Sequence, residues 1–171
     1  MEHKPLYRRM KEMNGAELGA LMERGKAPAE ESLAGWEFRG WNHPPVLALL
    51  GIRKFVKGFF RAGAGLEGYN RPPRQDGFEN EWTGAGRPFG FYDVVAPRAP
   101  DLRLPGALLL DYGANGRNPA WKPERFLRDY LVQPDPAEPD VLLGLATLAL
   151  PGRPATNYFL LERLGRSEWR P

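Results

Sequence analysis

Arginine and tyrosine side chains set among apolar residues are the groups in this chain best suited to bind a ligand. If Phe126–Gln133 is a strand, Arg128 and Tyr130 share one of its faces, because side chains two positions apart point the same way. Arg163 lies among apolar residues in a second such segment, Thr156–Leu164. A guanidinium inside a protein keeps its proton and must be paired. The two arginines therefore indicate either structural ion pairs or a site for an anionic ligand.

Two aspartates are the candidates for acid–base chemistry. Asp93 and Asp111 each alternate with apolar residues in a β-like segment. Burial on an apolar face raises the pKa of a carboxyl group, which suits a general acid or base. Cysteine is absent, and neither His3 nor His43 has a metal-ligand companion at useful spacing. The sequence therefore predicts no metal and no cofactor, and it leaves a small enzyme using Asp93 or Asp111 as an alternative.

A cationic and aromatic segment follows the first predicted strand. Between Phe38 and Leu66 the chain carries no acidic residue. Its cations and its apolar residues separate onto two faces at helical spacing, which predicts a helix at Val46–Arg61. The cationic face would hold Arg53, Lys54, Lys57 and Arg61. Such a face is typical of a helix that lies at an anionic membrane surface, or of a helix that closes one end of a barrel with its cations in solvent.

Length and composition favour one soluble, turn-rich domain. The chain has 171 residues, with 20 Gly and 18 Pro. The charged amino terminus and the lack of a long apolar run predict a cytoplasmic protein. Lys and Arg exceed Asp and Glu by only 24 to 21, and one segment alone is basic, which argues against a nucleic-acid partner.

Hydrophobic periodicity predicts a mainly β protein, with one domain spanning residues 1–171. Asn14 and Glu17 have the spacing of a capping box and predict a short helix before Gly25, within a helical extension and linker at residues 1–30. Short apolar runs between Gly/Pro turns then predict an antiparallel barrel. The predicted strands are Leu33–Trp41, Leu66–Asn70, Gly77–Thr83, Phe89–Val95, Ala107–Tyr112, Phe126–Gln133, Val141–Leu150 and Thr156–Leu164.

Two short motifs resemble the calycin superfamily, the lipocalins and fatty-acid-binding proteins. In that superfamily an Arg of the last barrel strand packs across a Trp of the first, and here Trp36 or Trp41 in LAGWEFRGW would meet Arg163 in YFLLERL. The Arg-x-Tyr of Arg128 and Tyr130 is similar to the carboxylate clamp of the fatty-acid-binding branch. Two departures stand out: the tryptophan directly follows its glycine, and Arg-x-Tyr precedes the last strand. The resemblance implies a closed barrel around a small hydrophobic ligand.

These observations lead to one main functional hypothesis. We expect a cytoplasmic binding protein for a small amphipathic or anionic hydrophobic ligand inside a barrel cavity. The expected ligand-binding residues are Trp36, Trp41, Arg53, Lys57, Arg128, Tyr130 and Arg163. The alternatives are the small enzyme described above and a module that binds an anionic membrane surface through the basic helix.

Overall fold

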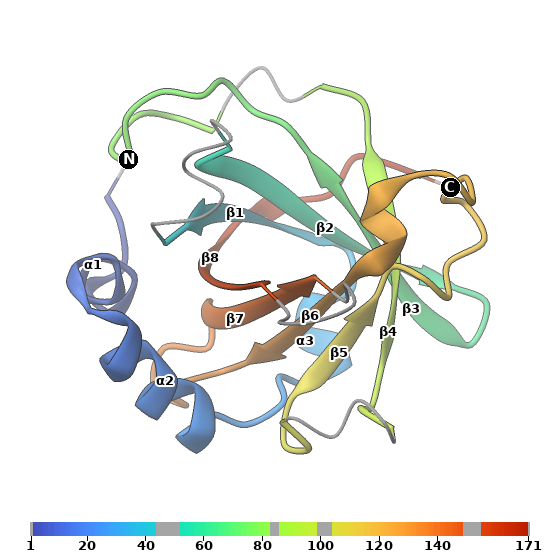
Figure 1. The fold of residues 1–171 in the computed structure, drawn as a ribbon. Coiled ribbons are helices and arrows are strands. Elements are labelled where there is room, and N and C mark those ends of the chain that lie inside the picture. Colours follow the sequence, from blue (N-terminus) through green and yellow to red (C-terminus); the bar gives the residue numbers. More distant parts are fainter. Residues whose placement is uncertain (1, 44–51, 83–85, 99–103, 149–154, 171) are drawn as a thin grey trace.

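Eight antiparallel strands close into a barrel in the order in which they occur along the chain (Figure 1). The computed structural model describes residues 2–43, 52–82, 86–98, 104–148 and 155–170. The barrel closes because β1 pairs with β2 on one side and with β8 on the other. The strands are β1 (Trp36–Asn42), β2 (Lys54–Ala62), β3 (Gly65–Arg71), β4 (Phe89–Val95), β5 (Leu108–Asp111), β6 (Leu127–Val132), β7 (Val141–Leu148) and β8 (Ala155–Arg166). The predicted mainly β fold and antiparallel barrel are confirmed.

The helix predicted at Val46–Arg61 is wrong where the chain is described, because its second half is strand β2. This strand pairs with neighbours on both sides and is buried on both faces over most of its length. Apolar residues therefore occur at odd and even positions, which mimics helical spacing. Residues 46–51 lie outside the described residues. The strand predicted at Gly77–Thr83 is also wrong, since residues 77–82 form turns and irregular chain.

Three helices precede the barrel: α1 (Pro5–Glu12), α2 (Gly15–Arg24) and the one-turn α3 (Glu30–Leu33). The predicted capping box is confirmed, because Asn14 Oδ1 accepts from the Glu17 amide at 3.1 Å and the Glu17 carboxylate accepts from the Asn14 amide at 2.8 Å. α1 packs beside β8 and α2 beside β7 on the outside of the barrel (Figure 1). Within the described residues, no helix has the length and apolarity needed to cross a membrane.

The barrel wall separates two hydrophobic cores. The outer core lies between the wall and the first two helices, where Tyr7 and Met10 of α1 and Leu18 of α2 belong to one buried cluster with Tyr130 and other wall residues. The inner core fills the barrel interior with large side chains such as Phe38 and Phe59, and Leu33 of α3 joins it. Because the barrel wall is buried on both sides, an apolar face of a strand can point either inward or outward.

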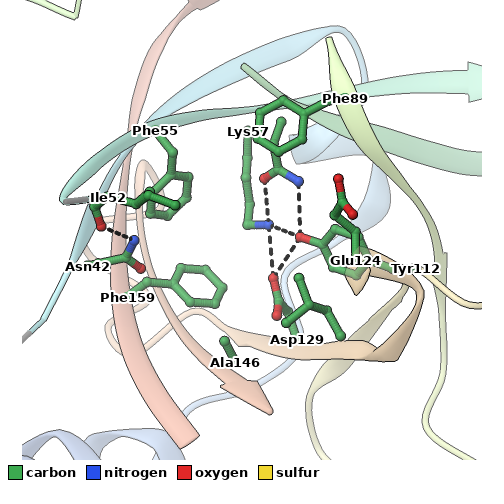
Figure 2. A pocket seen from close by; sticks show the side chains of 12 residues that line it. Asn42, Ile52, Phe55, Lys57, Phe89, Tyr112, Glu124, Asp129, Ala146 and Phe159 are labelled. Atoms are coloured by element: carbon green, nitrogen blue, oxygen red, sulfur yellow. Dashed lines mark hydrogen bonds and ion pairs between the residues drawn. The ribbon is translucent and has the colours of Figure 1, made fainter. Parts of the chain in front are cut away.

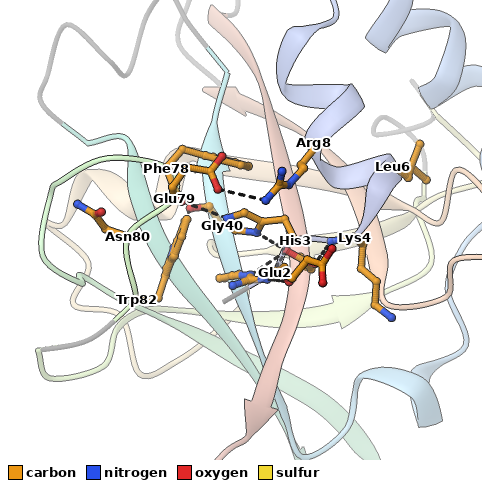
Figure 3. A network of polar contacts seen from close by, with 12 residues as sticks. Glu2, His3, Lys4, Leu6, Arg8, Gly40, Phe78, Glu79, Asn80 and Trp82 are labelled. Carbon is orange, nitrogen blue, oxygen red and sulfur yellow. Dashed lines mark hydrogen bonds and ion pairs between the residues drawn. The ribbon is translucent and has the colours of Figure 1, made fainter.

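The chain before α1 is fixed to the outer wall by buried ionic groups (Figure 3). His3 Nδ1 lies 2.8 Å from Glu162 Oε2 on β8, and Arg39 on β1 places its Nη2 2.7 Å from the same oxygen. The Lys4 amide donates to the other Glu162 oxygen at 2.6 Å. One buried carboxylate thus holds two strands and the amino-terminal segment together.

Glycines inside the barrel make room for aromatic rings, which predicts a test of the packing. A Cβ at Gly144 would lie 2.0 Å from the Phe159 ring, whereas a Cβ at Gly165 meets nothing within 4 Å. We expect Gly144→Ala to lower the free energy of unfolding by about 1–3 kcal/mol through overpacking. Gly165→Ala, on the next strand, is the matched control and should be near neutral. Urea denaturation measures both, and equal effects would contradict the packing described.

Candidate functional site

A cavity of about 300 Å³ lies at one end of the barrel interior (Figure 2). It sits where β1 ends and where β2, β4, β6 and β8 begin, as its lining residues show. The lining residues are Asn42, Ile52, Phe55, Lys57, Asn70, Phe89, Tyr112, Glu124, Leu127, Asp129, Ala146 and Phe159. The opposite end of the barrel is filled by the inner core.

The wall of the cavity is mostly apolar. The rings of Phe55 and Phe159 meet edge to face, with centroids 5.7 Å apart. Gly40 and Gly144 allow this arrangement, since a Cβ at either position would overlap one of the rings. Ile52 and Phe89 also line the cavity and are 48% and 43% exposed, so they mark its solvent side.

A buried ammonium group is the centre of the polar side of the cavity. Lys57 Nζ donates to Asn70 Oδ1 at 3.0 Å, to the Tyr112 hydroxyl at 2.6 Å and to Asp129 Oδ2 at 2.9 Å (Figure 2). A lysine ammonium has three protons. Each has one acceptor here, and we call these four residues the Lys57 cluster.

The partners of Lys57 are also bonded to one another and to the backbone. The Tyr112 hydroxyl donates to Asp129 Oδ2 at 2.9 Å and accepts from Asn70 Nδ2 at 3.2 Å. Asn70 Nδ2 also donates to the Gly90 carbonyl at 2.9 Å. Lys57 and Asn70 face each other across β2 and β3, while Asp129 comes from β6 and Tyr112 directly follows β5. Closure of the barrel is what brings these four elements together.

Burial changes the proton affinities of the cluster. It lowers the pKa of the Lys57 ammonium, and the nearby Asp129 carboxylate opposes that shift. Burial raises the pKa of the Tyr112 hydroxyl well above its usual value, and the Asp129 charge raises it further. Two carboxylate oxygens at the cavity have no hydrogen-bond partner among the described residues: Asp129 Oδ1 and Glu124 Oε2.

Trp36 and Arg163 lie at the filled end of the barrel, away from the cavity. The Arg163 guanidinium carbon is 4.4 Å from the centre of a Trp36 ring, and Arg163 Nε donates to Asp140 Oδ1 at 2.5 Å. The expected contact between an Arg of the last strand and a Trp of the first strand is therefore confirmed. Its position and its ion pair give it a structural role.

Trp41, Arg128 and Tyr130 point away from the cavity, so the inward face predicted for Arg128 and Tyr130 is wrong. Trp41 and Tyr130 belong to the outer core. Arg128 Nη1 lies 3.2 Å from Asp111 Oδ1 on the same outer face. The adjacent residue of β6, Asp129, points into the barrel instead. The sequence did not show which face of β6 is the inner one, because the outward face is also apolar and buried.

The cations of the basic segment have separate roles rather than forming one stripe. Arg53 is exposed, and Lys54 is fully buried with its Nζ paired to Asp76 and 4.0 Å from a Trp82 ring centre. Arg61 bonds Glu30 and a neighbouring glutamate. Of the predicted ligand-binding residues, Lys57 is the one that lines the described cavity.

The two predicted acid–base candidates do not line the cavity. Asp93 accepts from Asn115 Nδ2 at 2.6 Å, and its pKa is raised mainly by desolvation. Asp111 accepts from the backbone amides of the turn that follows it, in addition to its pairing with Arg128. The carboxylates at the cavity are Asp129 and Glu124, which sequence reasoning missed. A lysine in an acid-free apolar segment was the available signal, because a buried ammonium requires a partner from elsewhere in the chain.

The pairing of Lys57 with Asp129 predicts a strongly coupled pair of substitutions. Lys57→Met leaves the Asp129 carboxylate buried without its cation, which should cost about 3–5 kcal/mol of unfolding free energy. Adding Asp129→Leu removes the stranded charge, so the double variant should recover most of that loss. Urea denaturation of the three proteins gives the coupling energy. Arg61→Met, at an exposed pair, is the control and should cost less than about 1 kcal/mol. Additive effects at Lys57 and Asp129 would contradict the pairing.

Buried tyrosines predict a loss of stability at high pH. Unfolded tyrosines lose their protons near pH 10, by their usual pKa of about 10. Folded Tyr7, Tyr92 and Tyr112 keep theirs, because burial raises their pKa values. The unfolded state then binds fewer protons, so the free energy of unfolding falls as pH rises above that value. Tyr112→Phe should make this fall less steep, as urea denaturation across the alkaline range would show. Unchanged steepness would mean that Tyr112 titrates alike in both states.

Comparison of the chain with protein-family models, with curated proteins and with solved structures finds no match. The eight-stranded antiparallel barrel with amino-terminal helices is compatible with a calycin-like fold.

Proposed function

We propose that the barrel binds a small, largely apolar molecule in the cavity, with one polar group turned toward the Lys57 cluster. The observation that carries the proposal is the uneven filling of the barrel. Protein interiors are normally packed without voids much larger than a water molecule. Here large inner-core side chains occupy the barrel, and about 300 Å³ of space lies beside them at one end, between aromatic rings and a single polar cluster.

The cavity also limits the size of the ligand. Its volume is at the lower end of the about 300–1,000 Å³ typical of small-molecule sites. Phe55 and Phe159 close it from the sides, and the Lys57 cluster forms its polar side. A compact ring system or a short alkyl chain suits such a space better than a long fatty acid.

The sequence led us to expect an amphipathic or anionic hydrophobic ligand. Lys57 is the cation at the cavity, and its ammonium is already bonded to Asp129. A ligand carboxylate would therefore have to displace the Asp129 carboxylate or replace a weaker partner such as Asn70. Binding of anions then depends on opening a buried ion pair, which a direct comparison of ligands can test.

An enzymatic use of the same cavity is the second candidate. It is favoured by an interior carboxylate within hydrogen-bond distance of a phenol, since Tyr112 lies 2.9 Å from Asp129. Proton transfer between a positioned acid and a base needs such a distance. The reacting groups would be Tyr112, Asp129 and Lys57, in place of the outer-face aspartates expected from the sequence.

A cavity-filling variant predicts loss of ligand binding. Ala146 lines the cavity, so Ala146→Phe should occupy part of the space and weaken binding at least tenfold, or about 1.4 kcal/mol. Fluorescence of the neutral apolar dye N-phenylnaphthylamine, with competition by short alkyl alcohols and carboxylates, measures binding. Ala137→Phe, in an exposed turn, is the matched control and should bind as wild type does.

If no probe binds the wild-type protein, or if both phenylalanine variants bind equally well, the cavity is not the binding site. A thermal unfolding scan of each variant checks that Ala146→Phe is folded when its binding is measured.

A further inference from the structure

We propose that the polar group recognised in the cavity is a hydrogen-bond donor carrying positive charge, so that the ligand is a small amine with an apolar body. This inference rests on the proposed binding function and names its ligand class. It depends on which hydrogen-bond donors and acceptors of the lining side chains already have partners within the protein.

The donors of the Lys57 cluster are already used. All three ammonium protons of Lys57 have acceptors within the cluster. The Tyr112 hydroxyl donates to Asp129, and the side-chain amide of Asn70 donates to the Gly90 carbonyl and to Tyr112. The Asn42 side-chain amide uses one of its two N–H groups for the Ile52 carbonyl at 2.9 Å. An incoming anion would therefore find no spare side-chain donor in the Lys57 cluster, where the polar side of the cavity lies.

Acceptors at the cavity are not used up. Asp129 is 4% exposed and bonds both Lys57 and Tyr112 through one oxygen, Oδ2, which leaves Oδ1 buried without a partner. Glu124 lines the same cavity, and its Oε2 is also buried without a partner. A buried carboxylate oxygen without a donor is costly, because burial removes its hydration. A ligand N–H that reached either oxygen would relieve this cost at that residue.

The charges lead to the same conclusion. The lining residues include one cation, Lys57, and two carboxylates, Asp129 and Glu124, so the formal balance is one minus two, or one net negative charge. A ligand ammonium restores neutrality, whereas a ligand carboxylate would raise the imbalance to two negative charges. In a cavity with low dielectric constant such an imbalance is strongly unfavourable.

The aromatic wall is also suited to a cation. The Lys57 ammonium already lies 5.6 Å from the Phe55 ring centre and 5.2 Å from the Phe159 ring centre. Ring faces attract cations at such distances. The same rings can therefore contact both the apolar body of an amine and its charged end.

Three probes of equal length test the inference: phenylbutylamine, phenylbutanol and phenylbutyrate. Each carries a phenyl ring on a four-carbon chain, and in phenylbutyrate the fourth carbon is the carboxyl carbon, so the probes differ mainly in the charge and hydrogen bonding of the end group. Isothermal titration calorimetry at neutral pH and moderate salt should give the amine the tightest binding, about tenfold or more over the alcohol, and the butyrate the weakest. Competition with N-phenylnaphthylamine confirms that all three occupy the cavity.

Variants identify the groups responsible. Glu124→Gln removes one carboxylate without touching the Lys57 cluster, and it should weaken amine binding about tenfold and alcohol binding much less, because the alcohol carries no charge. Asp93→Asn, on the outer face, is the matched control and should change neither. The double variant Lys57→Met, Asp129→Leu removes the unpartnered Asp129 oxygen together with its ion pair, so it should reduce the preference for the amine while still binding the alcohol.

The outcomes separate this inference from the proposed function. Equal binding of all three probes, or tightest binding of the butyrate, overturns the amine inference and leaves the binding function standing. Binding of the alcohol with unchanged amine preference in Glu124→Gln and in the double variant also overturns it. If the dye binds and none of the three probes competes with it, the amine inference alone is overturned. If neither the dye nor any of the three probes binds, the binding function is rejected and the amine inference with it.

Discussion

A lysine ammonium buried inside a β-barrel is the constraint on which the arrangement of the cavity depends. Moving one ion out of water costs several kcal/mol unless charge and hydrogen bonds compensate. Lys57 therefore requires a carboxylate and two further acceptors at fixed directions. Asn70 of β3, Tyr112 directly after β5 and Asp129 of β6 supply them. None of these strands is adjacent to β2 except β3. The cluster thus forms only when the barrel is closed, and it links the barrel's register to the cavity's chemistry.

The two ends of the barrel use aromatic and charged groups for different purposes. At the filled end, Arg163 and Arg166 both lie over the rings of Trp36, and Asp140 fixes Arg163 by an ion pair. At the other end, Gly40 and Gly144 let the Phe55 and Phe159 rings lie back against the wall. Arginines stacked on a tryptophan thus lie at one end, and glycines that leave room for aromatic rings lie at the cavity end.

The sequence predicts the fold better than it predicts the site, and the reason is the second hydrophobic core. Strand positions such as Phe89–Val95 follow from local alternation and turn residues, and β4 has those same limits. Alternation does not say which face is inside when α1 and α2 cover the outer wall. Tyr130 and Asp129 are adjacent, and the apolar pattern pointed to the wrong one. The same two-sided burial gave β2 the spacing of a helix. Partners far along the chain, such as Lys57 and Asp129, cannot be paired from one sequence without the strand order.

The residues that line the cavity include the Lys57–Asp129 ion pair and a second carboxylate, Glu124. A structural ion pair alone would be complete with Lys57 and one carboxylate, and apolar residues of similar volume would often serve stability as well. Glu124 adds a second carboxylate that has no cation among the described lining residues, and Asp129 keeps one oxygen unbonded. Such unsatisfied groups call for an explanation in a native structure. The binding proposal gives one, because a ligand that donates to these oxygens would supply hydrogen bonds that the described residues do not.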